Sequence, residues 1–330
     1  MKKHPCRNIK IYILFILMLT AVILGGCGTT RDRSEPLRIA LITPRIDTPY
    51  WPKVLSGALG RAEQLGNIEV THLGATNENS PGKQTEKQIE IVEECIYEGY
   101  DGIILAAADR DALVVPIKEA KDAGIPVVMV DTGVSEPVYD ILFATDNERA
   151  GKLCAELMAE QIGGEGEVAI LNFSDKALVA MRREDGFVRE ITKNWPKIRV
   201  VGVEYCDYSW EAAAQYTEEF IQSYPGLKGV WAMNGAVVMG AVAGVAAQEK
   251  KDSVTVIGFD GIPELKELLK SGAVKASVVQ NPGMMGAEGV QAIVDILDGK
   301  TLPSRNVDMD VTVVTEENVD DEDIHIVLGW

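Results

Sequence analysis

The stretch that decides the fold class is residues 102–130, GIILAAADRDALVVPIKEAKDAGIPVVMV. Two short runs rich in Ile and Val, at residues 102–106 and 126–130, enclose a segment with the amphipathic pattern of a helix. Short continuous apolar runs are typical of strands that are buried on both faces, and a helix is the usual connection between parallel strands. The stretch therefore predicts a parallel β-α-β unit.

The same alternation continues on both sides of this unit. Because it begins again after about residue 145, and because 330 residues exceed one ordinary hydrophobic core, the sequence predicts an α/β fold with two doubly wound parallel-sheet lobes. Further strands are expected near residues 38–42, 69–73, 141–144, 168–172, 199–204, 229–232, 255–258 and 275–279, followed by a helix over 282–297 and a closing strand over 311–314.

The first 26 residues have the layout of a secretory signal peptide. Four basic residues and no acid precede an apolar run over residues 11–24, which is short for a membrane span. The sequence LGGC at residues 24–27 is similar to the bacterial lipobox, which implies cleavage before Cys27 and a lipid on its thiol. We expect a signal peptide at 1–26 and a polar tether at 27–36. A plain signal peptide with an incidental cysteine is the alternative.

The charge and the cysteines exclude some classes of protein. The chain has 50 acidic and 32 basic residues, for a net charge of −18, so we expect no nucleic-acid partner. Removal of the leader and lipidation of Cys27 would leave three thiols, at Cys95, Cys154 and Cys206, which excludes a fully paired disulfide framework. Cys95 and Cys154 lie in apolar helical patterns and are expected to be buried free thiols.

Polar and aromatic residues follow several of the expected strands. In doubly wound sheets, ligands bind at the carboxyl ends of the strands, near the point where the winding reverses. Sugars are bound by aromatic faces and by planar polar groups that exchange paired hydrogen bonds with hydroxyls. Each residue is also typical of an ordinary loop, a helix cap or a packing pair, so their joint placement is the signal. The aromatic candidates are Tyr50, Trp51 and Tyr208, and the polar candidates are Asp131, Arg183, Asn234, Asp260 and Gln280.

The sequence gives little support for an enzyme. The three histidines, His4, His72 and His325, are isolated, and no zinc-ligand spacing or Cys–His pair occurs. No glycine-rich phosphate loop follows the first expected strand. We therefore expect no catalytic residue, metal or cofactor. Glycoside processing by the carboxylates of Asp131 and Asp260 is the less favoured alternative.

Six motifs in order make the chain resemble the periplasmic sugar-binding proteins of the ribose and galactose group, which share their fold with the lactose-repressor ligand domains. The resemblance covers about residues 37–315. The motifs are Thr48-Pro49-Tyr50-Trp51 with Gly57 and Ala58, Val130-Asp131, Arg183-Glu184-Asp185-Gly186-Phe187, Met233-Asn234 with Gly240-Ala241, Val256-Ile257-Gly258-Phe259-Asp260-Gly261, and Gln280-Asn281-Pro282 with Gly286.

The resemblance implies a role for each candidate residue. Tyr50 and Trp51 would stack on one side of a sugar ring and Tyr208 on the other, while the polar candidates would bond its hydroxyls. Two positions depart from the ribose-binding pattern. Thr132 stands where an arginine is typical, and Thr48 stands where an asparagine is typical. Loss of an arginine fork removes a paired donor and enlarges the site, so a larger or differently substituted sugar is equally open.

The resemblance also implies an organisation and a function. Three crossings, near Thr145, Gln280 and Met309, would form a hinge that joins an N-terminal lobe (37–145 and 281–308) to a C-terminal lobe (146–280 and 309–330). We expect an extracytoplasmic, monomeric lipoprotein, held to the bacterial cell membrane by its lipid alone, that delivers a monosaccharide to the permease of an ABC importer. Presentation of a ligand to a sensor kinase or chemoreceptor is the alternative. A DNA-binding repressor is disfavoured, because an export leader stands in place of a helix-turn-helix headpiece.

The acidic tail at 316–330 ends in an apolar stretch. Two interpretations are open for it. The stretch docks on the second lobe, or it is a frayed extension.

Overall fold

The computed structural model describes residues 35–48, 50–76, 81–175 and 177–328. The expected signal peptide, Cys27 and most of the expected tether lie outside the described residues. Within them, none of the helices is both long enough and apolar enough to cross a bilayer.

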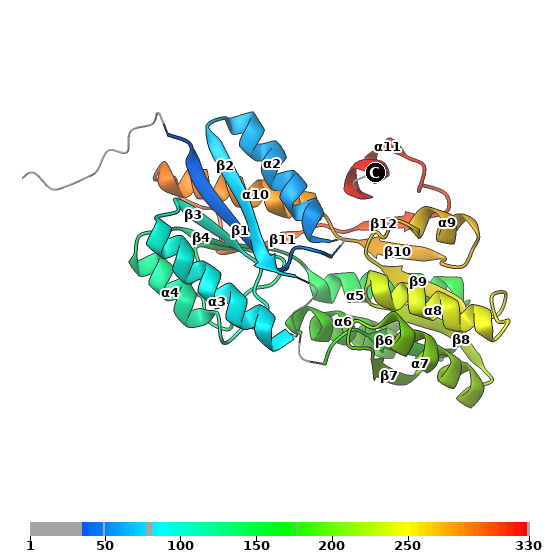
Figure 1. Cartoon of the computed structure of the whole chain (residues 1–330). Coiled ribbons are helices and arrows are strands. Elements are labelled where there is room, and N and C mark those ends of the chain that lie inside the picture. The colour runs from blue at the N-terminus through cyan, green and yellow to red at the C-terminus, as the bar shows by residue number, and fades with distance from the viewer. Residues whose placement is uncertain (1–34, 49, 77–80, 176, 329–330) are drawn as a thin grey trace, which may run out of the picture. The chain divides into compact units, whose positions relative to one another are not determined.

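Two six-stranded sheets form the folded part of the chain (Figure 1). The first sheet is parallel throughout and has the order β11-β5-β4-β3-β1-β2. Its strands are β1 (Leu37–Arg45), β2 (Ile68–Ala75), β3 (Gly102–Leu105), β4 (Val127–Val130), β5 (Ile141–Thr145) and β11 (Asn306–Met309). The winding reverses between β1 and β3, which places the ligand-binding edge of a doubly wound sheet at the carboxyl ends of these strands.

The second sheet repeats this order as β12-β10-β9-β8-β6-β7. Its neighbours are parallel except for β12, which is antiparallel to β10. The strands are β6 (Gly166–Asn172), β7 (Ile198–Tyr205), β8 (Leu227–Ala232), β9 (Thr255–Phe259), β10 (Ala276–Val279) and β12 (Thr312–Thr315). The prediction of two doubly wound parallel-sheet lobes joined by three crossings is confirmed, since the chain passes between the sheets after β5, β10 and β11.

Helices cover both faces of the first sheet. Ile39 and Leu41 of β1 face α2 and α10, whereas Ala40 and Ile42 face α3 and α4, as the alternation of side chains along a strand requires. All four side chains are buried, which explains the continuous apolar run. The helices are α2 (Trp51–Leu65), α3 (Pro81–Glu98), α4 (Val114–Asp122) and α10 (Pro282–Leu297).

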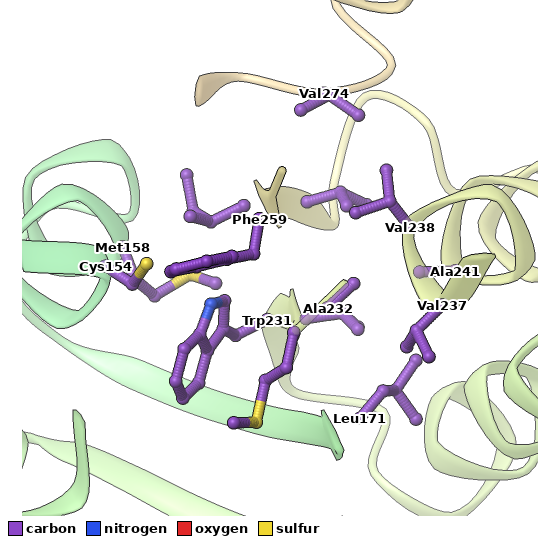
Figure 2. Close-up of a cluster of buried hydrophobic side chains, with 14 of the residues drawn as sticks. Cys154, Met158, Leu171, Trp231, Ala232, Val237, Val238, Ala241, Phe259 and Val274 are labelled. Atoms are coloured by element: carbon purple, nitrogen blue, oxygen red, sulfur yellow. The ribbon is translucent and has the colours of Figure 1, made fainter. Parts of the chain in front are cut away.

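The second lobe has its own apolar core. Helices α5 and α8 pack on the sheet, and Figure 2 shows Cys154 and Met158 of α5 on the Trp231 side of the strands and Val237 of α8 on the other side. The Trp231 ring stacks on Phe187 with a centroid distance of 4.4 Å. The helices are α5 (Asn147–Gln161), α6 (Leu178–Asn194), α7 (Trp210–Ser223), α8 (Gly235–Ala247), α9 (Leu265–Lys270) and α11 (Glu322–Leu328).

Close helix crossings depend on glycines. A Cβ on Gly151 of α5 would overlap the carbonyl oxygen of Arg183 in α6, and a Cβ on Gly186 would overlap that of Glu148. The backbones of α5 and α6 therefore touch, which fixes the position of Arg183 relative to the start of α5.

Two elements were missed by the sequence analysis. Strand β11 has the polar alternation NVDM and forms an exposed edge of the first sheet. Helix α11 resolves the question of the tail up to Leu328, because Ile324 and Leu328 are buried in the core of the second lobe. The apolar end of the tail docks on that lobe.

The three cysteines of the described region are free thiols. All three are buried, as expected for Cys95 and Cys154, and burial raises the pKa of each thiol.

Candidate functional site

The two sheets present a carboxylate at matching points. Asp131 follows β4 with φ 62°, and its backbone N–H donates to the carbonyl of Phe143 on β5 (2.8 Å). Asp260 follows β9 with φ 74°, and its N–H donates to the carbonyl of Val278 on β10 (3.0 Å). Aspartate is among the residues that tolerate this left-handed backbone. Both lobes therefore turn an acid out of the sheet at a carboxyl end, in equivalent local geometry.

Tyr50 is bonded to the first of these acids. It stands directly before α2, and its hydroxyl donates to Asp131 Oδ1 at 2.8 Å. Its ring meets Trp51 edge to face, with a centroid distance of 5.0 Å. Burial is the main cause that raises the pKa of Tyr50 well above its ordinary value, and the charges of Asp131 and Asp260 add to it. Tyr50 is therefore a protonated donor at neutral pH, and one oxygen of Asp131 is already occupied.

The pKa of Asp131 reflects opposing influences. Burial raises it, whereas the hydrogen bond from Tyr50 and the positive charge of Arg183 lower it. Burial is the largest influence, so the pKa of Asp131 lies above its ordinary value. Arg183 of the second lobe lies near enough to act on Asp131 of the first.

Arg183 is held from three sides. Its side chain belongs to α6 and is only 3% exposed. Nε donates to Asn147 Oδ1 at 2.7 Å, Nη1 donates to the Met233 carbonyl at 3.1 Å, and the guanidinium lies 3.8 Å from the centroid of the Phe259 ring. Among the described residues Arg183 forms no ion pair. A buried guanidinium without a paired carboxylate retains strong donors for another acceptor.

Gln280 joins the two sheets at their carboxyl ends. It follows β10 and is 4% exposed. Its Nε2 donates to Asp260 Oδ1 at 2.8 Å, and its Oε1 accepts from Thr145 Oγ1 at 2.8 Å. Since Thr145 ends β5 of the first sheet, one carboxamide links the two crossings that follow β5 and β10.

Asn234 and Thr132 already have local partners. Asn234 caps α8 by accepting from the backbone N–H of Val237 at 2.9 Å, which leaves its amide protons as donors. The hydroxyl of Thr132 donates to the Ala107 carbonyl at 3.0 Å. Thr132 therefore closes its own loop and does not replace the donors of an arginine.

The remaining candidates differ in their environment. Tyr208 has φ 60°, is 56% exposed, and its ring lies 5.1 Å from that of Phe173. Although much of the side chain is accessible, partial loss of hydration from the surrounding protein, with a contribution from the charge of Asp131, raises the pKa of Tyr208 to about 12. Trp51 is half-buried at the start of α2. The Oγ1 of Thr48 is buried and finds no hydrogen-bond partner among the described residues.

The structure brings most of the candidates together. Tyr50 bonds Asp131, and Gln280 bonds Asp260. The charges of Asp131, Asp260 and Arg183 all act on the pKa of Tyr50, and Arg183 packs on the ring of Phe259, the residue before Asp260. Lys53 of α2 also reaches the second lobe, because its Nζ donates to the Gly261 carbonyl at 2.8 Å.

Sequence reasoning missed four residues of this region. Asn147 and Lys53 hold the site together, and Phe173 and Phe259 flank Arg183. Two of the four could have been found from their position along the chain. Phe259 lies in the motif that ends in Asp260-Gly261, and Asn147 lies beside the crossing expected near Thr145. Within the described region, no cluster of three or more His, Cys, Asp or Glu side chains is suited to a metal ion.

Comparisons with known proteins identify the family and agree with the two-lobed fold. Residues 39–301 match the family model described as periplasmic binding protein domain. A D-ribose/D-allose-binding protein of Pseudomonas aeruginosa is 28% identical, over 86% of this chain and 92% of its own length. The ribose import binding protein of Bacillus subtilis is 26% identical over the same shares. Among solved structures, an ABC transporter solute binding protein from Agrobacterium vitis with bound D-fucose has a TM-score of 0.80 and 31% identity, and the match covers 88% of this chain and 99% of that one.

Proposed function

Since this chain belongs to the family of type I periplasmic sugar-binding proteins, we propose that it captures a monosaccharide between its two lobes and delivers it to an ABC importer. The observation that carries the proposal is the matched pair Asp131 and Asp260, each in a left-handed turn at the end of a strand. The Tyr50 hydroxyl bonds Asp131, and Arg183 packs on Phe259, the residue before Asp260. Carboxylates accept hydrogen bonds from adjacent hydroxyls, and a guanidinium donates to hydroxyl or ring oxygens. Binding is the whole function, and no bond is broken.

Each candidate has a role in this proposal. The rings of Tyr50 and Trp51 cover one face of the sugar and Tyr208 the other. Asp131, Arg183, Asn234 and Asp260 bond its hydroxyls, and Gln280 both orients Asp260 and offers its second amide proton. The local bond of Thr132 and the lone hydroxyl of Thr48 favour a sugar other than ribose. The complete set of residues proposed to contact the sugar is Thr48, Tyr50, Trp51, Asp131, Thr132, Arg183, Tyr208, Asn234, Asp260 and Gln280.

The proposed motion is closure of two lobes about three crossings. We assign residues 37–145 and 281–308 to the N-terminal lobe, and 146–280 and 309–330 to the C-terminal lobe. Membership of β11 in the first sheet and β12 in the second supports this division. The bond from Lys53 to the Gly261 carbonyl crosses between the lobes and would favour the closed form, which the membrane partner then recognises.

We also propose that the protein is an extracytoplasmic, monomeric lipoprotein. The basic and apolar leader at 1–26 and the cysteine at position 27 support it. A Cys27→Ala variant is expected to lose incorporation of labelled palmitate and to leave the membrane fraction. Retention of both in the variant would show that Cys27 is not the anchor.

The ligand is tested by thermal shift of the purified protein against D-ribose, D-allose, D-arabinose, D-fucose and D-tagatose. A sugar present at 100 times its dissociation constant stabilises a protein by about 2.7 kcal/mol, which gives a clear shift. If no sugar shifts the transition while another metabolite does, the sugar assignment is wrong. Release of a free sugar from a glycoside would instead favour the enzyme alternative.

The site is tested by calorimetry with the sugar that shifts the transition. Asp260→Ala and Arg183→Ala each leave a partner unsatisfied and are expected to cost about 1–3 kcal/mol, or about 5- to 150-fold in affinity. Asp185→Ala is the matched control, since that exposed carboxylate lies on the same helix as Arg183. Unchanged affinity in both site variants would remove these residues from the site.

Transport and sensing are separated in cells. Deletion of the gene is expected to abolish uptake of the radiolabelled sugar that binds. Normal uptake with a lost transcriptional or chemotactic response to that sugar would favour presentation to a sensor kinase or chemoreceptor.

A further inference from the structure

Asn147 occupies a buried position between the crossing that follows β5 and Arg183, which we propose to bind the sugar. It is the first residue of α5, directly after the crossing that follows β5, and it is 5% exposed. Its Nδ2 donates to the Thr145 carbonyl at 2.8 Å, and its Oδ1 accepts from Arg183 Nε at 2.7 Å. A carbonyl only accepts and the Nε–H only donates, so a single orientation of the carboxamide satisfies both partners.

The cap of α5 does not require the Asn147 side chain. Asp146 caps the helix by accepting from the backbone N–H of Arg149 at 3.0 Å. The carboxamide of Asn147 is therefore free to serve Arg183, and a buried carboxamide with both ends bonded is rigid.

The contacts of Arg183 leave one part of its guanidinium for a ligand. Asn147 binds Nε, the Met233 carbonyl binds Nη1, and the Phe259 ring covers one face. In the part of the chain that the structure describes, Nη2 has no hydrogen-bond partner. Rotation of the guanidinium about its long axis is opposed by the Nε bond, because that bond fixes the plane in which Nη2 lies.

We propose that Asn147 is a positioning residue of the sugar site, which sets the plane of the Arg183 guanidinium and ties it to the first crossing. The role assigned to Asn147 rests on the proposed function, because the site that it serves is the proposed sugar site. Thr145 extends the same arrangement, because its hydroxyl donates to Gln280, which in turn donates to Asp260. Through its carbonyl and its hydroxyl, one residue at the end of β5 is linked to both Arg183 and Asp260.

The first test needs no ligand. In a ¹H–¹⁵N spectrum of the full chain in detergent, the Arg183 Nε–H signal is assigned by its loss in Arg183→Lys. We expect this proton to exchange with water at least about tenfold faster in Asn147→Ala. Gln88→Ala is the matched control, since Gln88 is a buried carboxamide that bonds the Ala106 carbonyl in the first lobe. An unchanged exchange rate in Asn147→Ala would overturn the proposal.

The second test is a double-mutant cycle with D-ribose, D-allose and D-arabinose as probes. For a sugar that binds, Asn147→Ala is expected to weaken affinity about tenfold. In the Arg183→Ala background the same change should cost no more than about twofold, because it acts through the missing guanidinium. Gln88→Ala should have the same small effect in both backgrounds. Multiplicative losses for Asn147→Ala and Arg183→Ala would show that Asn147 does not act through Arg183.

A conservative variant covers the case in which Asn147→Ala does not fold. Asn147→Asp keeps an acceptor for Arg183 Nε and removes the donor to Thr145, so the Nε–H is expected to stay protected. Loss of its protection would contradict the assigned contact. If none of the five sugars of the thermal-shift test binds, another metabolite does, and the exchange data behave as expected, the proposed function fails and the contact between Asn147 and Arg183 stands.

Discussion

Replacement of Tyr50 with phenylalanine tests how a hydrogen bond acts on the buried carboxyl of Asp131. The change removes the 2.8 Å hydrogen bond to Asp131 Oδ1 and retains the ring that meets Trp51. A hydrogen bond to a charged acceptor contributes about 1.5–3 kcal/mol, whereas one between neutral groups contributes about 0.5–1.5 kcal/mol. The loss should therefore depend on whether Asp131 is charged.

The direction of the pH dependence follows from the pKa of Asp131. Burial raises the pKa of Asp131 in the folded protein above its ordinary 3.8, so the contribution of this group to stability declines as the pH rises through the raised value. The Tyr50 hydroxyl lowers that pKa, so its removal raises the pKa further and deepens the decline. We expect Tyr50→Phe to lose about 0.5–1.5 kcal/mol near pH 3, which lies below the ordinary pKa of 3.8 and therefore favours the protonated form of Asp131 in both states, and about 1.5–3 kcal/mol near pH 7.

Urea unfolding at the two pH values, followed by tryptophan fluorescence, measures this difference. Tyr97→Phe is the control, because Tyr97 is 93% exposed and should show no change at either pH. An equal loss at pH 3 and pH 7, or none at pH 7, would refute the reasoning about Asp131.

Three further predictions concern packing and thiol chemistry. Gly151→Ala places a methyl group against the Arg183 carbonyl and is expected to destabilise the protein by about 1–3 kcal/mol, whereas Gly60→Ala, with open space around its Cβ, should stabilise α2 by about 0.5–1 kcal/mol in urea unfolding. Leu328→Ala is expected to cost about 2–5 kcal/mol and the exposed Ile326→Ala under about 0.5 kcal/mol, and equal thermal shifts would contradict docking of α11. The three buried cysteines should resist iodoacetamide at pH 8 until urea is added, as read by peptide mass mapping, because burial raises the pKa of each thiol; rapid labelling of the folded protein would contradict this.

Local sequence was sufficient to predict a helix or strand where burial produced a strong apolar pattern. The helix expected over 282–297 is found as α10 (Pro282–Leu297), because Asn281 caps it and Pro282 begins it. Strand β11 was missed because its NVDM pattern is polar and its existence depends on pairing with β5, about 160 residues earlier along the chain. Pairing at such a distance leaves no local signal.

The site residues also divide into features that local sequence predicts and contacts that it does not. The rule that ligands bind at strand ends was enough to select Asp131 and Asp260, since each directly follows an apolar strand. It did not reveal that Tyr50 bonds Asp131 or that Asn147 bonds Arg183. Those contacts join residues 81 and 36 positions apart, and they exist only because the helices and sheets are packed together.

The place of β11 and α10 in the first sheet has a consequence for synthesis. The first lobe lacks an edge strand and a covering helix until residue 309 is available, because β11 pairs with β5 and α10 packs on α2. Contacts between segments so distant form late and slow the folding of a chain. An amino-terminal fragment that ends at residue 145 would retain α2 over β1 and β2 but would expose the apolar surface of β3, β4 and β5 that α10 covers. A nascent chain of this protein therefore cannot complete its first lobe until residue 309 has been made.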